Sequence, residues 1–203
     1  HQKQFNPTQK PNIMKITGLI YTGPIFKGID KIVSNDQLRP VMNHAYIDKG
    51  HIIATDAHAL VKIDLSFFGI DQEGADLLEG KCIDKETLQK LGAIKAKQSF
   101  AITEQGFCLM KSNSLIPSVI YPIQLMNEVG NYPNYDAVIP TVISEQDQTS
   151  LNANLLLNVD NVFSSVNTEG KILQINFHGR NKAVTLTCEG SRFLGLLMPR
   201  MSN

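Results

Sequence analysis

Apolar positions along the chain change their spacing in a regular order. From Pro24 onward they recur every three or four residues, which predicts a short helix with one apolar stripe. The residues of this stripe are Ile25, Phe26, Ile29, Ile32 and Val33. Three strands are predicted next, at 41–48, 51–55 and 58–65. Lys49 and Gly50 form the tight turn between the first two strands, so this part reads as one helix followed by an antiparallel sheet.

The same order recurs twice. Residues 81–83 are typical of a strand, and Asp84 can cap a helix over 85–93. Strands are then predicted at 99–103, 107–111 and 115–124. A third copy has a helix over 154–166 and strands at 172–178, 183–189 and 193–198. The predicted fold class is therefore α+β, with three repeated helix-plus-three-strand units and antiparallel sheets.

One such unit cannot cover both its helix stripe and its sheet face, so units should pair into domains. We expect two units to form a domain over 14–140 and the third to form a half-domain over 141–203. Residues 1–13 are rich in Gln, Lys, Asn and Pro and predict a flexible arm or an artificial start of the chain. Because the third unit has no mate inside the chain, a homodimer that joins two third units is expected.

Composition places the chain among globular proteins. Of its 203 residues 42% are hydrophobic and 19% charged, and apolar runs stay well short of a membrane span, so a cytoplasmic protein is expected. Lys and Arg together number 19, as do Asp and Glu, so the net charge of the chain does not attract nucleic acid. A neutral total does not exclude a basic face. The three cysteines, Cys82, Cys108 and Cys188, are predicted to be reduced and buried.

The sequence predicts neither a catalytic site nor a metal site. His44, His51 and His58 are seven residues apart, but the hairpin puts the first two roughly 13 Å from each other, too far for one metal ion. Asp56 and His58 lack a nucleophile elbow, and no glycine-rich phosphate loop is present. Asp56 is instead predicted to stabilise a turn. We expect no enzyme activity, no metal and no cofactor; an enzyme on a mixed scaffold is the less favoured alternative.

Three segments resemble one known family. Residues 52–61, IIATDAHALV, resemble the ATDGHRL segment of the bacterial sliding clamp, the β subunit of DNA polymerase III. Residues 131–140, NYPNYDAVIP, are similar to its FPNYxxVIP linker, and residues 196–201, LLMPRM, to its terminal VMPMRL. The resemblance implies a DNA-clamp-like fold in which 14–140 matches the middle domain and 141–203 the last half of the final domain.

The resemblance also implies a groove in which a DNA polymerase or another clamp-binding protein docks a short hydrophobic peptide. Carried over to this chain, the groove residues are Thr55, His58, Leu60, Pro140, Met198 and Pro199. The family's Gly and Arg are replaced by Ala57 and Ala59, which changes the polar character of the site. The alternative is that Leu60, Ile139 and Met198 are ordinary core residues of a fold that has lost its groove.

Sliding clamps line their hole with basic helices that touch DNA phosphates, so weak, nonspecific contact with double-stranded DNA is a second expectation. The candidate residues are Lys90, Lys95 and Lys97. The third helix carries no Lys or Arg, and a lysine run is often only a solvated helix face. The alternative function is a structural or regulatory relative, a decoy with no DNA role.

Overall fold

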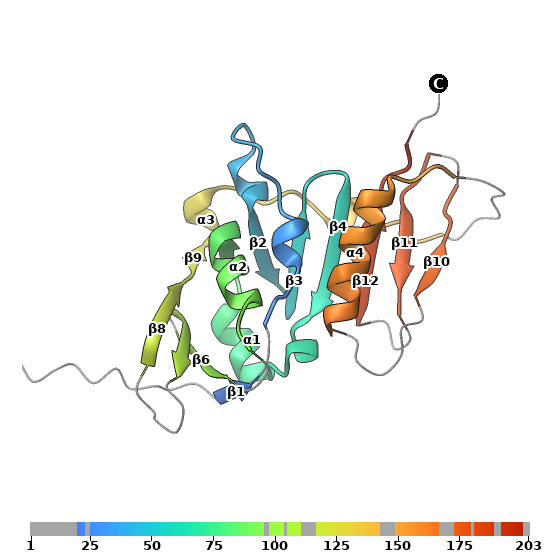
Figure 1. The fold of residues 1–203 in the computed structure, drawn as a ribbon. Helices are drawn as coiled ribbons and strands as arrows, with labels where there is room; N and C mark the ends of the chain where they lie inside the picture. The colour runs from blue at the N-terminus through green and yellow to red at the C-terminus, as the bar shows by residue number, and fades with distance from the viewer. Residues whose placement is uncertain are drawn as a thin grey trace, which may run out of the picture.

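The computed structural model describes residues 20–22, 25–95, 98–103, 105–110, 117–142, 149–166, 173–179, 181–188 and 192–200. Within these ranges the strands form two antiparallel sheets (Figure 1). The smaller sheet has the order β1 (Ile20–Thr22), β6 (Ser99–Thr103), β7 (Gly106–Met110), β8 (Pro117–Pro122). The larger sheet has the order β10 (Gln174–Asn176), β11 (Val184–Thr187), β12 (Phe193–Leu197), β4 (Ala59–Asp64), β3 (His51–Thr55), β2 (His44–Asp48), β5 (Lys81–Asp84), β9 (Gln124–Leu125).

In Figure 1, α2 and α4 lie in front of the strands. Helix α4 contacts β12 and β4 of the larger sheet, α2 contacts β5 of the larger sheet and β8 of the smaller one, and α1 contacts β6 of the smaller sheet. The α-helices are α1 (Gln72–Leu78), α2 (Lys85–Gly92), α3 (Met126–Val129) and α4 (Ala153–Val166). The 3-10 helices are η1 (Ile29–Lys31), η2 (Pro40–Asn43), η3 (Leu65–Phe68) and η4 (Asp136–Val138). The mixture of helices and antiparallel sheets confirms the predicted α+β class.

The first two units exchange strands. β1 precedes η1 of the first unit but pairs with β6 of the second, and β5 precedes α2 of the second unit but pairs with β2 of the first. The third unit, α4 with β10 to β12, joins the larger sheet through β12, which pairs with β4. One main hydrophobic core runs under all three units, and buried residues of each unit contribute to it.

Local chemistry explains where the elements match the predictions. The side chain of Asp84 accepts a hydrogen bond from the backbone N–H of Thr87, so the predicted cap of α2 is confirmed. The first predicted helix is shorter than expected, since Phe26 at φ 57° and Gly28 at φ 82° interrupt the helical backbone before η1. The apolar stripe predicted there is nevertheless buried. Helix α1 was missed because the segment carries Gly74 and a narrow apolar stripe, although Asp71 caps it.

Helix α4 packs closely against β12, the strand that joins the third unit to the first. Val159, Val162 and Phe163 of α4 are buried, and Phe163 stacks obliquely on Phe193 of β12 with ring centroids 5.2 Å apart. Gly195 makes this approach achievable, because a Cβ placed on it would lie 2.5 Å from Cγ1 of Val159. The predicted buried state of Cys82, Cys108 and Cys188 is confirmed.

Candidate partner-binding groove

The segment 54–60 and the segment 196–200 meet where the first and third units join. Leu60 of β4 faces Leu196 of β12, and Ala59 faces Leu197. The pairing continues past the strand ends, since the backbone N–H of Met198 donates to the carbonyl of His58 at 3.0 Å. Residues about 140 positions apart in the sequence are thus held at hydrogen-bonding distance by an eight-stranded sheet.

A tight turn carries the first wall of this junction. Oδ1 of Asp56 accepts from the backbone N–H groups of His58 at 2.9 Å and Ala59 at 2.8 Å, which confirms the predicted turn-stabilising role of this carboxylate. The hydroxyl of Thr55 donates to the carbonyl of Ala59 at 2.8 Å and accepts from the N–H of Ala57 at 3.1 Å. Ala57 has φ 74°, a left-handed conformation that strains any residue with a Cβ.

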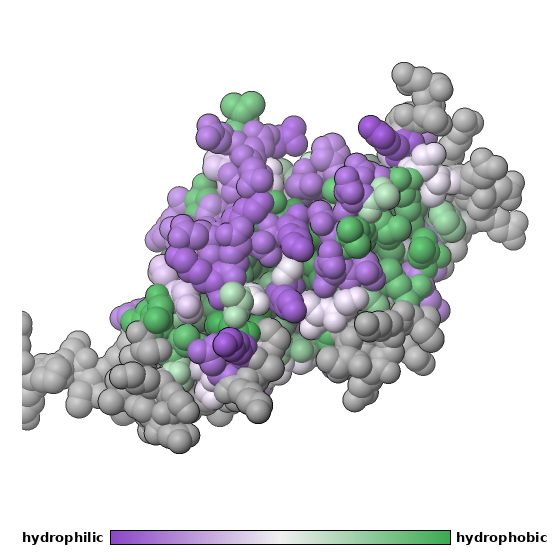
Figure 2. Space-filling model, in the orientation of Figure 1, coloured by the Kyte–Doolittle hydropathy of each residue, from purple (hydrophilic) through white to green (hydrophobic). Residues whose placement is uncertain are grey.

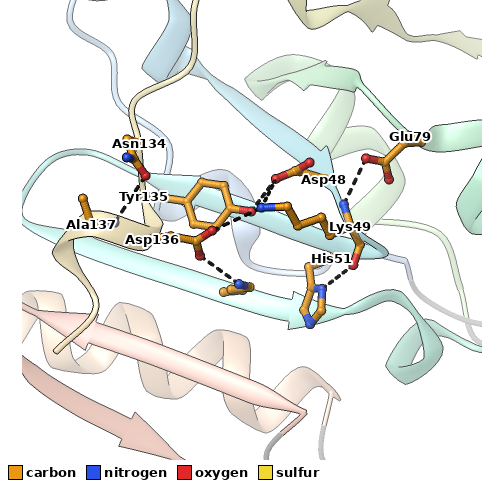
Figure 3. A network of polar contacts seen from close by, with 9 residues as sticks. Asp48, Lys49, His51, Glu79, Asn134, Tyr135, Asp136 and Ala137 are labelled. Carbon is orange, nitrogen blue, oxygen red and sulfur yellow. Dashed lines mark hydrogen bonds and ion pairs between the residues drawn. The ribbon is translucent and has the colours of Figure 1, made fainter. Parts of the chain in front are cut away.

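The linker 131–140 is held against the sheet by a polar network (Figure 3). The hydroxyl of Tyr135 donates to Oδ2 of Asp48 at 2.5 Å. The carboxylate of Asp136 lies between two ammonium groups, 3.1 Å from Nζ of Lys62 and 3.3 Å from Nζ of Lys49. The Lys62 ammonium also lies 5.0 Å from the centre of the Tyr135 ring. The linker is therefore tied to β2 and β4 from two sides.

The ionisable groups of this network respond to their surroundings. Burial, reinforced by the hydrogen bond to Asp48, raises the pKa of Tyr135 above its ordinary value, so the phenol remains a hydrogen-bond donor at neutral pH. The hydrogen bond from Lys62, followed by that from Lys49, lowers the pKa of Asp136 and keeps its carboxylate charged. These protonation states are the ones that the observed contacts require.

A hollow of about 540 Å³ opens beside the junction. Segments around residues 40, 57, 135 and 197 enclose it, so four distant parts of the chain contribute walls. Its lining residues are Leu38, Arg39, Pro40, Val41, Met42, Thr55, Ala57, His58, Ala59, Leu60, Pro133, Asn134, Tyr135, Val138, Leu196 and Met198. Most of this surface is apolar, and the mix of apolar walls with a few polar groups is typical of ligand sites.

A second hollow of about 420 Å³ adjoins the first. Its lining residues are Ala137, Val138, Ile139, Pro140, Thr141, Val142, His178, Asn181, Lys182, Ala183 and Met198. Val138 and Met198 line both hollows, and their side chains are 51% and 41% exposed. We call the two hollows together the junction groove. Its shared ridge consists of two apolar side chains that come from the linker and from the segment after β12.

Comparison with known proteins gives the same picture of the fold. No family model and no curated protein sequence matches the chain. Among solved structures, the DNA polymerase III β subunit of Borrelia burgdorferi in complex with a natural product superposes with a TM-score of 0.62 at 13% identity, over 92% of this chain and 64% of that one. The chain has the sliding-clamp fold.

Two further clamps superpose in the same way. The Bartonella birtlesii sliding clamp bound to griselimycin has a TM-score of 0.60 at 13% identity and covers 97% of this chain and 69% of its own. The Helicobacter pylori β clamp bound to a DNA ligase peptide has a TM-score of 0.57 at 12% identity, over 98% and 70%. The chain spans less than two thirds of the Borrelia clamp. The resemblance read from the three sequence segments is confirmed at the level of the fold.

Most of the groove residues expected from the clamp resemblance line the junction groove. Thr55, His58, Leu60 and Met198 line the first hollow, Pro140 and Met198 line the second, and Pro199 lines neither. Thr55 and Leu60 are buried, and both hydrogen bonds of the Thr55 hydroxyl are internal, so these two residues shape the floor. His58 and Met198 offer exposed surface.

The alternative prediction, that groove candidates are ordinary core residues, applies to Leu60 and Ile139. Leu60 and Ile139 pack in a small apolar cluster with Ile53, Tyr135 and Leu196 beneath the groove. Residues that the sequence did not point to are Leu38 and His178. The only local signal was that Leu38 is the single apolar residue of the polar stretch 34–39. Its side chain is almost fully exposed.

The cationic residues proposed for DNA are distributed differently from expectation. Nζ of Lys90 pairs with Glu86 at 2.6 Å, Lys95 is exposed beyond the end of α2, and Lys97 lies outside the described residues. A hollow of about 550 Å³ between η1, α2 and α4 is lined by Lys27 and Lys31, and by none of the three candidates. The cations beside this hollow are therefore Lys27, which precedes η1, and Lys31, which lies within it.

The described residues contain no group of three His, Cys, Asp or Glu side chains that could hold a metal ion. The rings of His44 and His51 instead face backbone carbonyls, of Pro40 at 3.0 Å and of Lys49 at 2.7 Å. In the same ranges, no helix is long and apolar enough to cross a membrane.

Proposed function

We propose that the protein is a clamp-like interaction protein that docks short hydrophobic segments of partner proteins in the junction groove. The observation that carries this proposal is the ridge of Val138 and Met198, two exposed apolar side chains shared by adjoining hollows. Isolated exposed apolar residues are common, but a contiguous set within a concave surface marks an interaction site. An extended peptide that crosses the ridge would place one apolar anchor in each hollow.

The strength of such binding follows from the size of the groove. Burying one Leu or Phe contributes roughly 1.5 to 3 kcal/mol, whereas association costs about 4 to 15 kcal/mol. Two anchors with a few backbone hydrogen bonds therefore give weak, exchangeable binding. Met198 adds an adaptable wall, because its unbranched side chain fits anchors of different shape. The groove is suited to exchange between partners.

The kind of partner is proposed from the fold neighbours. One of them is the Helicobacter pylori β clamp bound to a DNA ligase peptide. By analogy, the partners of this protein are a DNA polymerase or another clamp-binding protein, each through a peptide, and the role is that of a non-enzymatic processivity factor relative in the cytoplasm.

Weak, nonspecific contact with double-stranded DNA is the second part of the proposal, with Lys90, Lys95 and Lys97 as candidates. Replacing all three by Ala should flatten the dependence of DNA affinity on salt. Unchanged affinity in the triple variant would contradict the assignment. The Lys90–Glu86 pair and the absence of Lys and Arg from α4 favour the other candidate, a decoy that occupies clamp partners without touching DNA.

The groove is tested by titrating the protein with a fluorescent clamp-binding-type peptide that carries two apolar anchors. Met198→Asp and Val138→Asp place a carboxylate on the ridge and should each weaken binding by about tenfold or more. Leu125→Asp on β9 is the matched control, because Leu125 is 44% exposed but lies at the opposite edge of the larger sheet. No saturable binding by the parent would rule out the proposal, and equal loss in the control would move the site elsewhere.

A further inference from the structure

The permanently charged residues that line the junction groove are all cations. Arg39 lines the first hollow and Lys182 lines the second, so each hollow has one. Both residues are exposed. His58 and His178 also line the groove, whereas none of the described lining residues is Asp or Glu. Because the whole chain has no net charge, this distribution is a local property of the groove.

A hydrogen-bonded turn places Arg39 at the rim of the first hollow. The backbone N–H of Asp36 donates to Oγ of Ser34 at 2.9 Å, and the N–H of Arg39 donates to the carbonyl of Asp36 at 3.2 Å. Pro40 then begins η2, and its ring restricts the backbone directly after Arg39. The preceding Leu38 is exposed and lines the same hollow. The rim therefore offers an apolar side chain and a cation at consecutive positions.

A second turn places Lys182 at the second hollow. It lies between β10 and β11, and the backbone N–H of Lys182 donates to the carbonyl of Gly179 at 3.0 Å. In the same segment, Nδ1 of His178 donates to the carbonyl of Val142, and its Nε2 lies 2.8 Å from Oγ1 of Thr185. Both ring nitrogens of His178 thus have partners inside the protein, so this histidine shapes the wall and Lys182 supplies the charge.

Neither cation forms an ion pair within the described part of the chain. Three carboxylates lie within two positions of a lining residue, and each has other partners. Oδ1 of Asp36 accepts from the backbone N–H of Leu38 at 2.8 Å. Asp56 accepts from two backbone N–H groups of its own turn, and Asp136 is paired with two lysines. The positive charge at the groove is therefore available to the carboxylates of a ligand.

We propose that the junction groove selects acidic peptides, with one carboxylate beside each of the two apolar anchors; this selection rests on the proposed docking of a peptide in the groove. Arg39 pairs with the carboxylate beside the first anchor, and its planar guanidinium suits a carboxylate because it offers two parallel N–H donors. Lys182 pairs with the carboxylate beside the second anchor. A basic peptide with the same anchors is repelled, so the two cations distinguish partners whose apolar residues are alike.

An acidic peptide fits this surface better than nucleic acid does. The ridge of Val138 and Met198 separates the two hollows and consists of exposed apolar side chains. A phosphate backbone offers charge but no apolar group to cover that ridge, whereas a peptide offers both. The combination of an apolar ridge with one cation in each hollow therefore favours a protein segment.

The selection is tested by titrating the full chain with three versions of the fluorescent two-anchor peptide, which carry Glu, Gln or Lys at the positions that flank the anchors. One exposed ion pair strengthens binding up to about fivefold, so two pairs should make the Glu version bind about threefold or more tighter than the Gln version. The Lys version should bind more weakly than either. Raising the salt concentration from about 0.05 M to about 0.5 M should reduce these differences, because salt screens exposed charges.

Two double variants identify the cations responsible. Arg39→Glu with Lys182→Glu should invert the order of the three peptides, and Arg39→Gln with Lys182→Gln should bind all three within about twofold of one another. The matched control is Lys27→Glu with Lys31→Glu, which changes the net charge as much as the first variant does. These exposed lysines line the hollow between η1, α2 and α4, which shares no lining residue with the junction groove. Figure 2 shows the face that carries α2 and α4, where the surface over α2 is largely hydrophilic. The control should keep the parent's order.

The outcomes separate the charge selection from the docking itself. Equal affinity of the parent for the three versions overturns the selection and leaves the groove in place, as does an equal loss of preference in the Lys27→Glu/Lys31→Glu control. If no version shows saturable binding, the proposed docking fails and the selection fails with it. Displacement of the bound Glu peptide by a duplex DNA oligonucleotide, abolished in Arg39→Glu/Lys182→Glu, would assign the two cations to phosphate groups and overturn the proposal.

Discussion

Gly195 controls how closely α4 approaches the strand that joins the third unit to the first. A Cβ added there would lie 2.5 Å from Cγ1 of Val159, 3.3 Å from Cε1 of Phe193 and 3.4 Å from Cβ of Leu186. Non-bonded carbon atoms prefer separations of about 3.5 to 4.0 Å, so Gly195→Ala demands a shift of roughly 1 Å at Val159. Val has a stiff χ1 in a helix and cannot rotate away, so the whole helix must move.

The expected cost can be worked from these contacts. Overpacking of a tight core costs about 1 to 3 kcal/mol. Replacing Gly by Ala also restricts the unfolded chain, which returns about 0.4 to 1 kcal/mol. From the middle of each range, about 2 kcal/mol against about 0.7 kcal/mol, the net loss in the free energy of unfolding should be about 1 to 1.5 kcal/mol. With a urea m-value of about 2 kcal/mol/M, the unfolding midpoint should fall by roughly 0.5 to 0.75 M.

The assay is urea unfolding followed by circular dichroism for the parent, Gly195→Ala, Val159→Ala and the double variant. Val159→Ala alone leaves a cavity and should also be destabilising. In the Val159→Ala background, however, the Cβ of Ala at position 195 fits into that cavity, so adding it should cost nothing or stabilise. The refuting result is additivity: if Gly195→Ala costs the same in both backgrounds, contact with Val159 is not the cause.

Three further predictions concern the junction groove and the strands beside it. Ala57→Gly should raise the free energy of unfolding by about 0.5 to 1 kcal/mol in urea unfolding, because φ 74° strains Ala more than Gly; a loss of stability would contradict the strain. The lowered pKa of Asp136 means that its pairs with Lys62 and Lys49 stabilise the fold fully above pH about 4. This contribution should disappear as the pH falls through the lower folded-state pKa, so Asp136→Asn should flatten that part of the pH profile, and an unchanged profile would exclude the pairs as its cause. Burial raises the pKa of Cys82 to about 11, so iodoacetamide at pH 8 should modify it far more slowly in the folded protein than in urea, and equal rates would show an accessible thiol.

Much of the fold was predictable because it depends on local patterns. The strands predicted at 51–55 and 58–65 and the predicted Lys49–Gly50 turn correspond to β3, β4 and the turn before β3, and Asp84 marked the start of α2. The first helix was overpredicted because an apolar spacing of three and four does not reveal the left-handed φ of Phe26. Apolar burial was predicted correctly there even though the helix was not, since burial depends on side-chain chemistry more than on backbone type.

The candidate site was predictable only in part. The clamp resemblance of segments 52–61, 131–140 and 196–201 pointed to residues that do line the junction groove, such as His58 and Met198. Leu38 escaped notice because nothing in its local sequence distinguishes an exposed groove residue from an ordinary loop residue. The pairing of Lys90 with Glu86 is local, because the two residues lie four positions apart on α2, and it places a carboxylate beside this candidate for DNA contact.

The sequence by itself determined the element types, the repetition of a helix followed by strands, and the turn around Asp56, because each depends on residues a few positions apart. Only the tertiary structure decided that β4 pairs with β12 and that Val138 and Met198 become one ridge. These features depend on contacts between residues far apart in the chain. Such contacts form only where whole apolar faces fit together, and no local pattern records which faces will meet.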